Sequence, residues 1–258
     1  MATQPPAPAV CLVVASQVPA RHFARATLLG RSLEQFPKRL RPRLYLRAAN
    51  SGEAAMGLAS LYNEAIEAQD DDVILVFLHD DVYLHDWNLN FQLQLALSQF
   101  AVVGLVGASG VPYGQPGWAH GLGEDGCAQR NRSARWSGSL NHFDPAQVRA
   151  EDFGVAPAAV DLLDGLFLAC RRRTLLESGL RFDPQFRFHC YDTDFCYSAR
   201  RLGLRLGTWP IACTHGSAGG FDAAWVASAR RLMAKLQAQV GPLAPPDQGP
   251  AGGGGSGA

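Results

Sequence analysis

Six consecutive apolar residues, Val73–Leu78, constrain the fold more than any other segment of the chain. A strand that is apolar at every position is buried on both faces, which is typical of a parallel sheet covered by helices. Two more apolar runs, Val10–Ala15 and Ala101–Ala108, predict further buried strands. The chain therefore predicts an α/β fold built around a central sheet.

Segments with helical patterns alternate with these strands. The expected helices are residues 22–35, 56–68, 86–99, 192–202 and 221–240, and the further strands are Arg43–Leu46, Val160–Leu163 and Gly165–Cys170. This order predicts a mostly parallel, Rossmann-like sheet flanked by helices, within one domain at residues 9–242.

Three segments lack this alternation. Residues 109–158 are rich in Gly, Pro and Ser without a clear period, and we expect a long functional loop there. Residues 1–8 and the Gly/Pro-rich residues 243–258 predict disordered tails.

Composition narrows the class of protein. With 23 Lys+Arg against 23 Asp+Glu, the chain has no global charge that favours nucleic acid. No run approaches the roughly 20 apolar residues of a membrane span, and the N-terminus lacks the pattern of a signal peptide. The six cysteines form no CxxC pair, so we expect reduced thiols in a cytoplasmic protein.

The first candidate site is His79-Asp80-Asp81, directly after the buried run. Ligand sites of parallel sheets lie beyond the carboxyl ends of their strands. Two carboxylates and an imidazole at that point suit a divalent ion. The alternative is a plain helix cap or solvated turn, and this is our interpretation of Asp70–Asp72 at the opposite end of the strand.

The second candidate site is the pair Asp192 and Asp194, at the start of a predicted helix. Aspartate is favoured as an N-cap and in the first helical turn, so a capping role is one interpretation. The other is catalysis, because one of two neighbouring carboxylates can acquire a raised pKa and act as a general base.

The third candidate is His215, which is followed by a Gly/Ser run that can approach a metal-bound diphosphate. A structural zinc site made of Cys190, Cys196, Cys213 and His215 is an alternative, but the spacing matches no common zinc pattern.

In combination, these segments resemble family 2-like glycosyltransferases with the GT-A fold. The stretch LYNEAIEAQDDDVILVFLHDDVYL resembles the helix and strand that lead into the family's Asp-x-Asp metal motif. The stretches VDLLDGLFLACRRRTL and FDPQFRFHCYDTDFCYSARRLG resemble its acceptor half, and THGSAGG resembles the closing histidine of its metal site. The resemblance covers roughly residues 9–220 and is nearest to the glycosyltransferase-like family that includes a streptomycin-biosynthesis protein.

The resemblance implies a hexosyltransferase-like enzyme that moves a sugar from a nucleoside-diphosphate sugar to an acceptor hydroxyl with inversion, using Mn²⁺ or Mg²⁺. It implies that Asp81, His215 and His79 hold the metal and that Asp192 is the base. The nucleotide sugar is expected to contact Asp80, Asn63, Asn50 and Ser16. The acceptor is expected to face Asp164 and Gly165. Trp118 and Trp136 are candidates to stack on a sugar ring, with simple packing as the alternative. The chain departs from the family pattern where His79 and Tyr191 replace acidic residues.

Two other functions fit the same residues. A nucleotidyltransferase would need a basic residue in the first loop, which Arg21 or Arg25 provides. A non-catalytic module that binds nucleotide sugars or carbohydrate would keep the fold without turnover.

Overall fold

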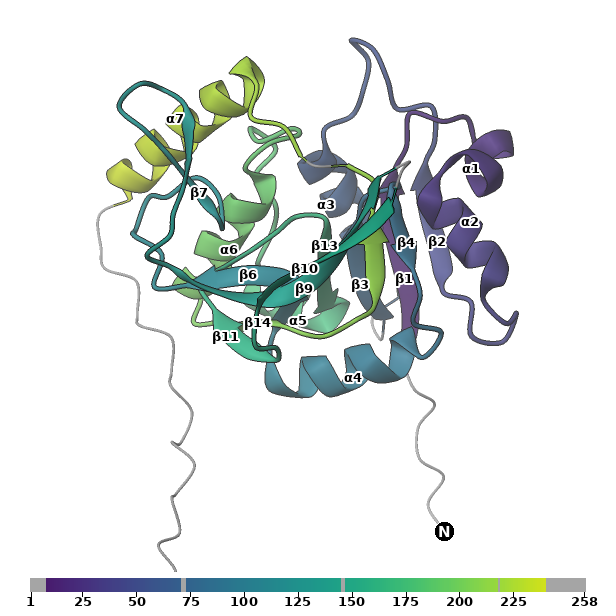
Figure 1. Cartoon of the computed structure of the whole chain (residues 1–258). Helices are drawn as coiled ribbons and strands as arrows, with labels where there is room; N and C mark the ends of the chain where they lie inside the picture. Colours follow the sequence, from purple (N-terminus) through teal and green to yellow (C-terminus); the bar gives the residue numbers. More distant parts are fainter. Residues whose placement is uncertain (1–7, 71–72, 145–146, 218, 240–258) are drawn as a thin grey trace, which may run out of the picture.

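The computed structural model describes residues 8–70, 73–144, 147–217 and 219–239 (Figure 1). The helices are α1 (Ala20–Ala26), α2 (Leu28–Gln35), α3 (Leu58–Ala68), α4 (Leu89–Gln99), α5 (Arg172–Ser178), α6 (Tyr191–Arg201) and α7 (Ala223–Ala238). The strands are β1 (Ala9–Ala15), β2 (Arg43–Arg47), β3 (Val73–Leu78), β4 (Val82–Leu84), β5 (Val102–Gly104), β6 (Val106–Ser109), β7 (His120–Leu122), β8 (Ala128–Arg130), β9 (Arg135–Asp144), β10 (Gln147–Gly154), β11 (Ala158–Val160), β12 (Leu162–Leu163), β13 (Phe167–Arg171), β14 (Leu206–Thr208) and β15 (Cys213–His215).

The main sheet has seven strands in the order β11-β14-β5-β13-β3-β1-β2. Strand β1 is parallel to β2 and β3, and β14 is parallel to β5. The expected α/β class is confirmed, but the sheet is mixed. It is mixed because β13 runs antiparallel to both of its neighbours and β11 runs antiparallel to β14.

A second sheet has the strand order β12-β6-β9-β15-β4, with β10 paired to β9, and β7 pairs with β8 in a separate ribbon. Apolar residues of β1 and β3 alternate between two cores, one on each face of the main sheet. Helices α3, α5, α6 and α7 contribute to one core, whereas α1, α2, α4 and the second sheet contribute to the other. In Figure 1, α4 runs along the bottom of the molecule and α7 lies at the upper left.

The helix expected at residues 22–35 is two helices, α1 and α2. Thr27 separates them with an extended backbone (φ −107°, ψ 154°). Its hydroxyl O–H donates to Phe23 O (2.8 Å) and its oxygen accepts from Gly30 N–H (2.9 Å), so Thr27 is the N-cap of α2. Apolar periodicity alone does not reveal such a break.

Two further expectations for the middle of the chain were wrong. The single strand expected at Ala101–Ala108 is split at Leu105, so that β5 joins the main sheet and β6 the second sheet. The segment 109–158, expected to be a loop, contains β7 to β10, and β9 is the central strand of the second sheet.

Other expectations concern the chain ends and the cysteines. All six cysteines are free, and Cys127 is the exposed one. Among the described residues, no helix has the length and apolar character needed to cross a bilayer. The expected tails and the turn at Asp70–Asp72 lie outside the described residues, apart from Pro8 and Asp70.

Candidate active site

A cavity of about 540 Å³ lies where the three sequence motifs meet. Its lining includes His79 after β3, His215 at the end of β15, and Asp192 in the first turn of α6. Asp164 and Gly165, in the turn before β13, complete this part of the wall.

Backbone hydrogen bonds fix these segments beside one another. His79 N–H donates to Leu166 O (3.2 Å), because β13 pairs with β3. Gly216 N–H donates to Asp81 O (2.8 Å), because β15 pairs with β4. A Cβ on Gly216 would lie only 2.8 Å from Leu28 Cδ1 and 3.1 Å from Asp81 O, so glycine permits this close approach.

His79, Asp81 and His215 form the one group with metal-ligand geometry among the described residues, with ligand atoms that all lie within 4.8 Å of one another. Asp81 Oδ1 is 3.4 Å from His215 Nε2 and 3.9 Å from His79 Nδ1. This oxygen is buried and has no hydrogen-bond partner. Buried polar atoms normally have partners, and a divalent cation between the three side chains would supply one. The residues therefore fit a metal ion.

The three side chains of this group shift one another's pKa values. Burial raises the pKa of Asp81, but His215 and His79 outweigh this effect and bring the pKa to about 2. Burial lowers the pKa of His215, and the Asp81 carboxylate reverses this to a net increase. Burial lowers the pKa of His79, which favours the neutral imidazole that binds metals.

Tyr191 orients the ring of His79. The Tyr191 hydroxyl donates to the carbonyl oxygen of Gly165 (3.1 Å) and lies 2.9 Å from His79 Nε2. A carbonyl oxygen can only accept, so the single hydroxyl proton is used there, and His79 Nε2 must be the donor in its own contact. The lone pair of His79 is consequently on Nδ1, the atom that faces Asp81.

Asp80 points toward the end of β1. Ser16 Oγ donates to Asp80 Oδ2 (2.5 Å) and accepts from Val18 N–H (3.1 Å). Burial raises the pKa of Asp80, although the Ser16 hydrogen bond opposes the increase. Two of the four residues expected to contact the nucleotide sugar are thus in direct contact with each other.

Asp192 and Asp164 form the acidic part of the cavity wall. Asp192 Oδ2 accepts from Gly165 N–H (2.9 Å), while Asp164 accepts from Leu166 N–H (2.8 Å) and Trp118 Nε1–H (2.6 Å). Burial and then the Asp164 charge raise the pKa of Asp192 to about 7. A carboxylate with a pKa near neutrality suits a general base.

The helix that carries Asp192 begins at a residue with an unusual backbone. Cys190 has φ 60° and ψ 5°, a left-handed conformation uncommon for residues with a Cβ. The Cys190 thiol and the Thr193 hydroxyl both donate to Pro116 O, at 3.5 and 3.2 Å. These contacts hold the first turn of α6 against the cavity wall, and such conformations cluster at functional sites.

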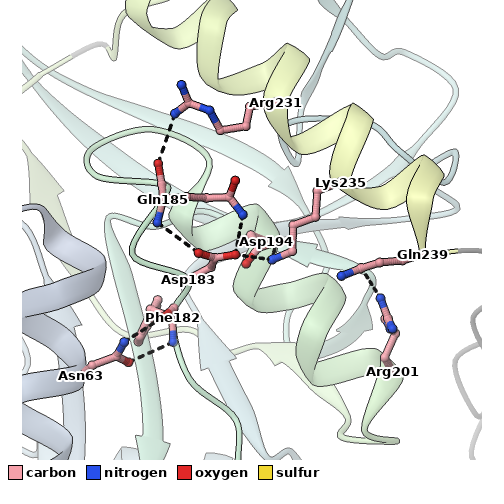
Figure 2. A network of polar contacts seen from close by, with 9 residues as sticks. All are labelled: Asn63, Phe182, Asp183, Gln185, Asp194, Arg201, Arg231, Lys235 and Gln239. Atoms are coloured by element: carbon pink, nitrogen blue, oxygen red, sulfur yellow. Dashed lines mark hydrogen bonds and ion pairs between the residues drawn. The ribbon is translucent and has the colours of Figure 1, made fainter.

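Asp194 lies away from the cavity, although we expected it to be a second candidate catalytic residue. Its Oδ1 accepts from Lys235 Nζ (2.6 Å) on α7, and the same ammonium donates to Asp183 Oδ2 (2.8 Å), as Figure 2 shows. Asp194 is 1% exposed and does not line the cavity. It joins α6 to α7.

Neither Asn63 nor Asn50 lines the cavity. The Asn63 amide bonds both ways with the backbone of Phe182, donating to its carbonyl (2.7 Å) and accepting from its N–H (3.0 Å), as Figure 2 shows. The Asn50 amide does the same with the backbone of Met56, at 2.8 and 2.7 Å. Both side chains hold loops in place here.

Trp118 lines the cavity, whereas Trp136 is not among its lining residues and has the Arg130 guanidinium 4.2 Å from the centre of its ring. Sequence reasoning missed several cavity residues: His120, His142, His189, Arg130 and Glu151. Five of the seven histidines line this one cavity. A signal for His142 existed, because Trp136, Leu140 and His142 recur at the spacing of one face of a strand.

Comparison with known protein families assigns the chain to one of them. A family model described as "Glycosyltransferase like family" matches residues 49–238. The chain belongs to this family. Membership in the glycosyltransferase-like family confirms the resemblance to family 2-like enzymes with the GT-A fold. No curated protein matches the chain.

Solved structures similar to this glycosyltransferase-like chain include GalNAc-T7 with UDP, GalNAc and Mn²⁺ (TM-score 0.48, 12% identity, 88% of this chain and 48% of that chain). Others are S. aureus TarS 1-349 (TM-score 0.44, 11% identity, 81% and 60%) and the catalytic domain of Drosophila beta1,4galactosyltransferase 7 with xylobiose (TM-score 0.40, 14% identity, 77% and 63%). The chain therefore spans about half to two thirds of these three proteins.

Proposed function

We propose that this protein transfers a sugar from a nucleoside-diphosphate sugar to an acceptor hydroxyl with inversion, using a divalent ion. The observation that carries the proposal is one cavity whose wall includes His79, His215 and Asp192. His79 and His215 form a possible metal-ligand set with Asp81, which offers a site for a diphosphate-bound cation. Asp192 offers a base with a pKa of about 7.

In the proposed reaction, Asp192 accepts the proton of the acceptor hydroxyl. The acceptor oxygen forms a bond to the anomeric carbon as the bond from that carbon to the diphosphate breaks, and the diphosphate leaves with the electron pair. The ion bound by the His–Asp–His set supplies charge stabilisation for the leaving diphosphate. Asp80 and Ser16 contact the donor nucleotide, and Asp164 with Trp118 contacts the acceptor.

A panel of nucleotide sugars, incubated with the protein and Mn²⁺ or Mg²⁺, tests the proposal. Release of nucleoside diphosphate that depends on an acceptor supports glycosyl transfer. Release of pyrophosphate would instead indicate a nucleotidyltransferase, and saturable binding without product would indicate a binding module. Neither Arg21 nor Arg25 lines the cavity.

The metal requirement has its own test. EDTA should abolish transfer, and added Mn²⁺ or Mg²⁺ should restore it. Asp81→Asn should weaken binding of the donor in the presence of the ion and leave binding in EDTA unchanged. Equal binding by the wild type and Asp81→Asn with the ion present would contradict the site.

A further inference from the structure

The wall of the cavity also contains three rings that no step of the proposed reaction uses. They are His120 on β7, Phe221 just before α7, and Trp225 in the first turn of α7. The centre of the Phe221 ring lies 4.4 Å from that of His120 and 4.9 Å from that of Trp225. We call these three residues the ring group.

Phe221 is held by its neighbours without being covered by them. It is 47% exposed, although His120 and Trp225 both contact its ring. A Cβ on Gly220, the preceding residue, would meet no atom within 4 Å, so the space beside Phe221 is open. Exposed apolar surface at a cavity is typical of a binding surface rather than of packing.

The polar groups near these rings favour an uncharged ligand. Burial and then the charge of Arg130 lower the pKa of His120, against a smaller opposing effect of Asp164. The imidazole is therefore neutral at neutral pH and offers one hydrogen-bond donor and one acceptor. Arg130 is already paired, since its Nη2 lies 3.3 Å from Glu151 Oε1.

The charge next to Phe221 in the chain is occupied as well. Asp222 Oδ1 accepts from Trp225 N–H (2.9 Å) as the N-cap of α7, and it lies 3.8 Å from His189 Nε2. No lysine is among the described residues that line the cavity. A ligand of the ring group thus meets apolar ring surface and a neutral imidazole, with no unpaired cation for a phosphate or carboxylate.

We infer that the acceptor is an oligosaccharide, and that Phe221 stacks on the sugar ring next to the one that receives the transfer. The inference rests on the proposed function in that the acceptor occupies this cavity. A sugar ring has a face of C–H groups that packs on an aromatic ring, and its hydroxyls can bond to the neutral imidazole. A flat aromatic acceptor would fit a slot between parallel rings, whereas Phe221 is inclined by 49° to His120 and by 84° to Trp225.

The spacing of two neighbouring residues suits two adjacent sugars. Trp118 donates to Asp164, which faces the reacting hydroxyl in the proposed reaction, and His120 contacts Phe221. Trp118 and His120 are two residues apart, so their Cα atoms are separated by at most about 7 Å. The cavity of about 540 Å³ that contains both is as large as sites that enclose a ligand of this size.

Saturation-transfer difference NMR with defined saccharides tests the inference without any assay of turnover. The probes are maltose, cellobiose and N,N′-diacetylchitobiose, each compared with its monosaccharide on the full chain. At least one disaccharide should receive saturation on both of its rings. It should bind roughly three- to tenfold more tightly than its monosaccharide, the contribution of one stacked ring.

Phe221→Ala should reduce the affinity for this disaccharide by the same factor and remove the saturation of one ring. The affinity for the monosaccharide should stay within about twofold, because its own contacts do not include the stacked ring. Phe221→Tyr keeps a ring of the same shape and should bind like wild type. Phe143→Ala is the matched control, because Phe143 is 48% exposed but does not line the cavity.

Failure of all three disaccharides to bind would overturn the inference, and so would equal disaccharide binding by the wild type and a folded Phe221→Ala. Coumarin serves as a flat aromatic probe. Coumarin binding that Phe221→Ala abolishes, with no saccharide bound, would assign the ring group to an aromatic acceptor instead. Disaccharide binding by a chain that transfers no sugar would uphold the saccharide site and refute the proposed function, whereas transfer to an acceptor without any sugar would do the reverse.

Discussion

Asp192 and Asp164 line one cavity, and the charge of Asp164 adds to burial in raising the pKa of Asp192 to about 7. The two carboxylates are held separately, since Gly165 N–H donates to Asp192 and Trp118 Nε1–H donates to Asp164. This arrangement separates their roles, because Asp192 exchanges a proton near neutral pH while Asp164 is anchored by the indole.

The first prediction concerns the pH dependence of transfer. A base is active when deprotonated, so kcat/KM should rise with pH through about 7 and fall below it. Asp164→Asn removes a charge that raises the pKa of Asp192, so the rising limb should move to lower pH. The measurement is the midpoint of the acidic limb of kcat/KM for both proteins.

Asp70→Asn is the control for this experiment. Asp70 lies before β3, at the opposite end of the strand from His79, and its side chain is 92% exposed. It should leave the midpoint unchanged. A limb that does not move in Asp164→Asn would show that Asp164 does not act on the titrating group.

Local patterns in the sequence were enough to predict β3, the strand that leads into His79 and Asp81, but not β15, the strand that carries His215. Val73–Leu78 is apolar throughout and is buried throughout as β3, and the site residues follow directly. The split at Leu105 was not predictable in the same way, because membership of one sheet or the other depends on distant partners, β13 for β5 and β9 for β6.

Helix geometry alone could have separated Asp194 from Asp192 at the stage of the sequence. Residues two apart on a helix do not share a face, so Asp192 and Asp194 could not both point into one cavity. What the sequence could not provide was the partner of Asp194. Lys235 lies 41 residues later on α7, and only the packing of α7 on α6 brings its ammonium within 2.6 Å.

The second prediction concerns Ser16 and Asp80, the residues that we propose contact the donor. Ser16→Ala removes the hydroxyl that donates to Asp80 and accepts from Val18 N–H. If these residues contact the nucleotide, the Kd of the donor should increase roughly threefold to tenfold, the cost of one net hydrogen bond. Calorimetry with a nucleoside diphosphate measures it. Ser98→Ala, at an exposed position of α4, is the control, and equal affinities for all three proteins would contradict the donor assignment.

The third prediction uses two glycines with opposite surroundings. A Cβ on Gly165 would lie 2.5 Å from Tyr191 Oη and 2.8 Å from Asp192 Cβ, so Gly165→Ala must displace the metal-positioning tyrosine and the base. We expect a loss of about 1–3 kcal/mol in stability and a large fall in kcat. A Cβ on Gly121 would meet no atom within 4 Å, so Gly121→Ala should keep wild-type melting and turnover. Thermal melts and initial rates compare the pair, and full activity in Gly165→Ala would contradict this account of the site.

The last prediction separates the two aspartates of α6, because substitution of one should lower kcat and substitution of the other should lower stability. Asp192→Asn keeps a side chain of the same shape but cannot accept a proton at neutral pH, so it should fold normally and lose about 10²–10⁴-fold in kcat. Asp194→Asn removes the charge that pairs with Lys235 in a buried contact, so it should cost about 1–3 kcal/mol of stability and leave kcat within a few-fold of wild type. Melting temperature and kcat, measured for both variants, give a two-way comparison in which each variant is the control for the other. A collapse of kcat in a well-folded Asp194→Asn, with Asp192→Asn still active, would show that Asp194 and not Asp192 is the base, because an amide at position 192 cannot accept the proton of the acceptor.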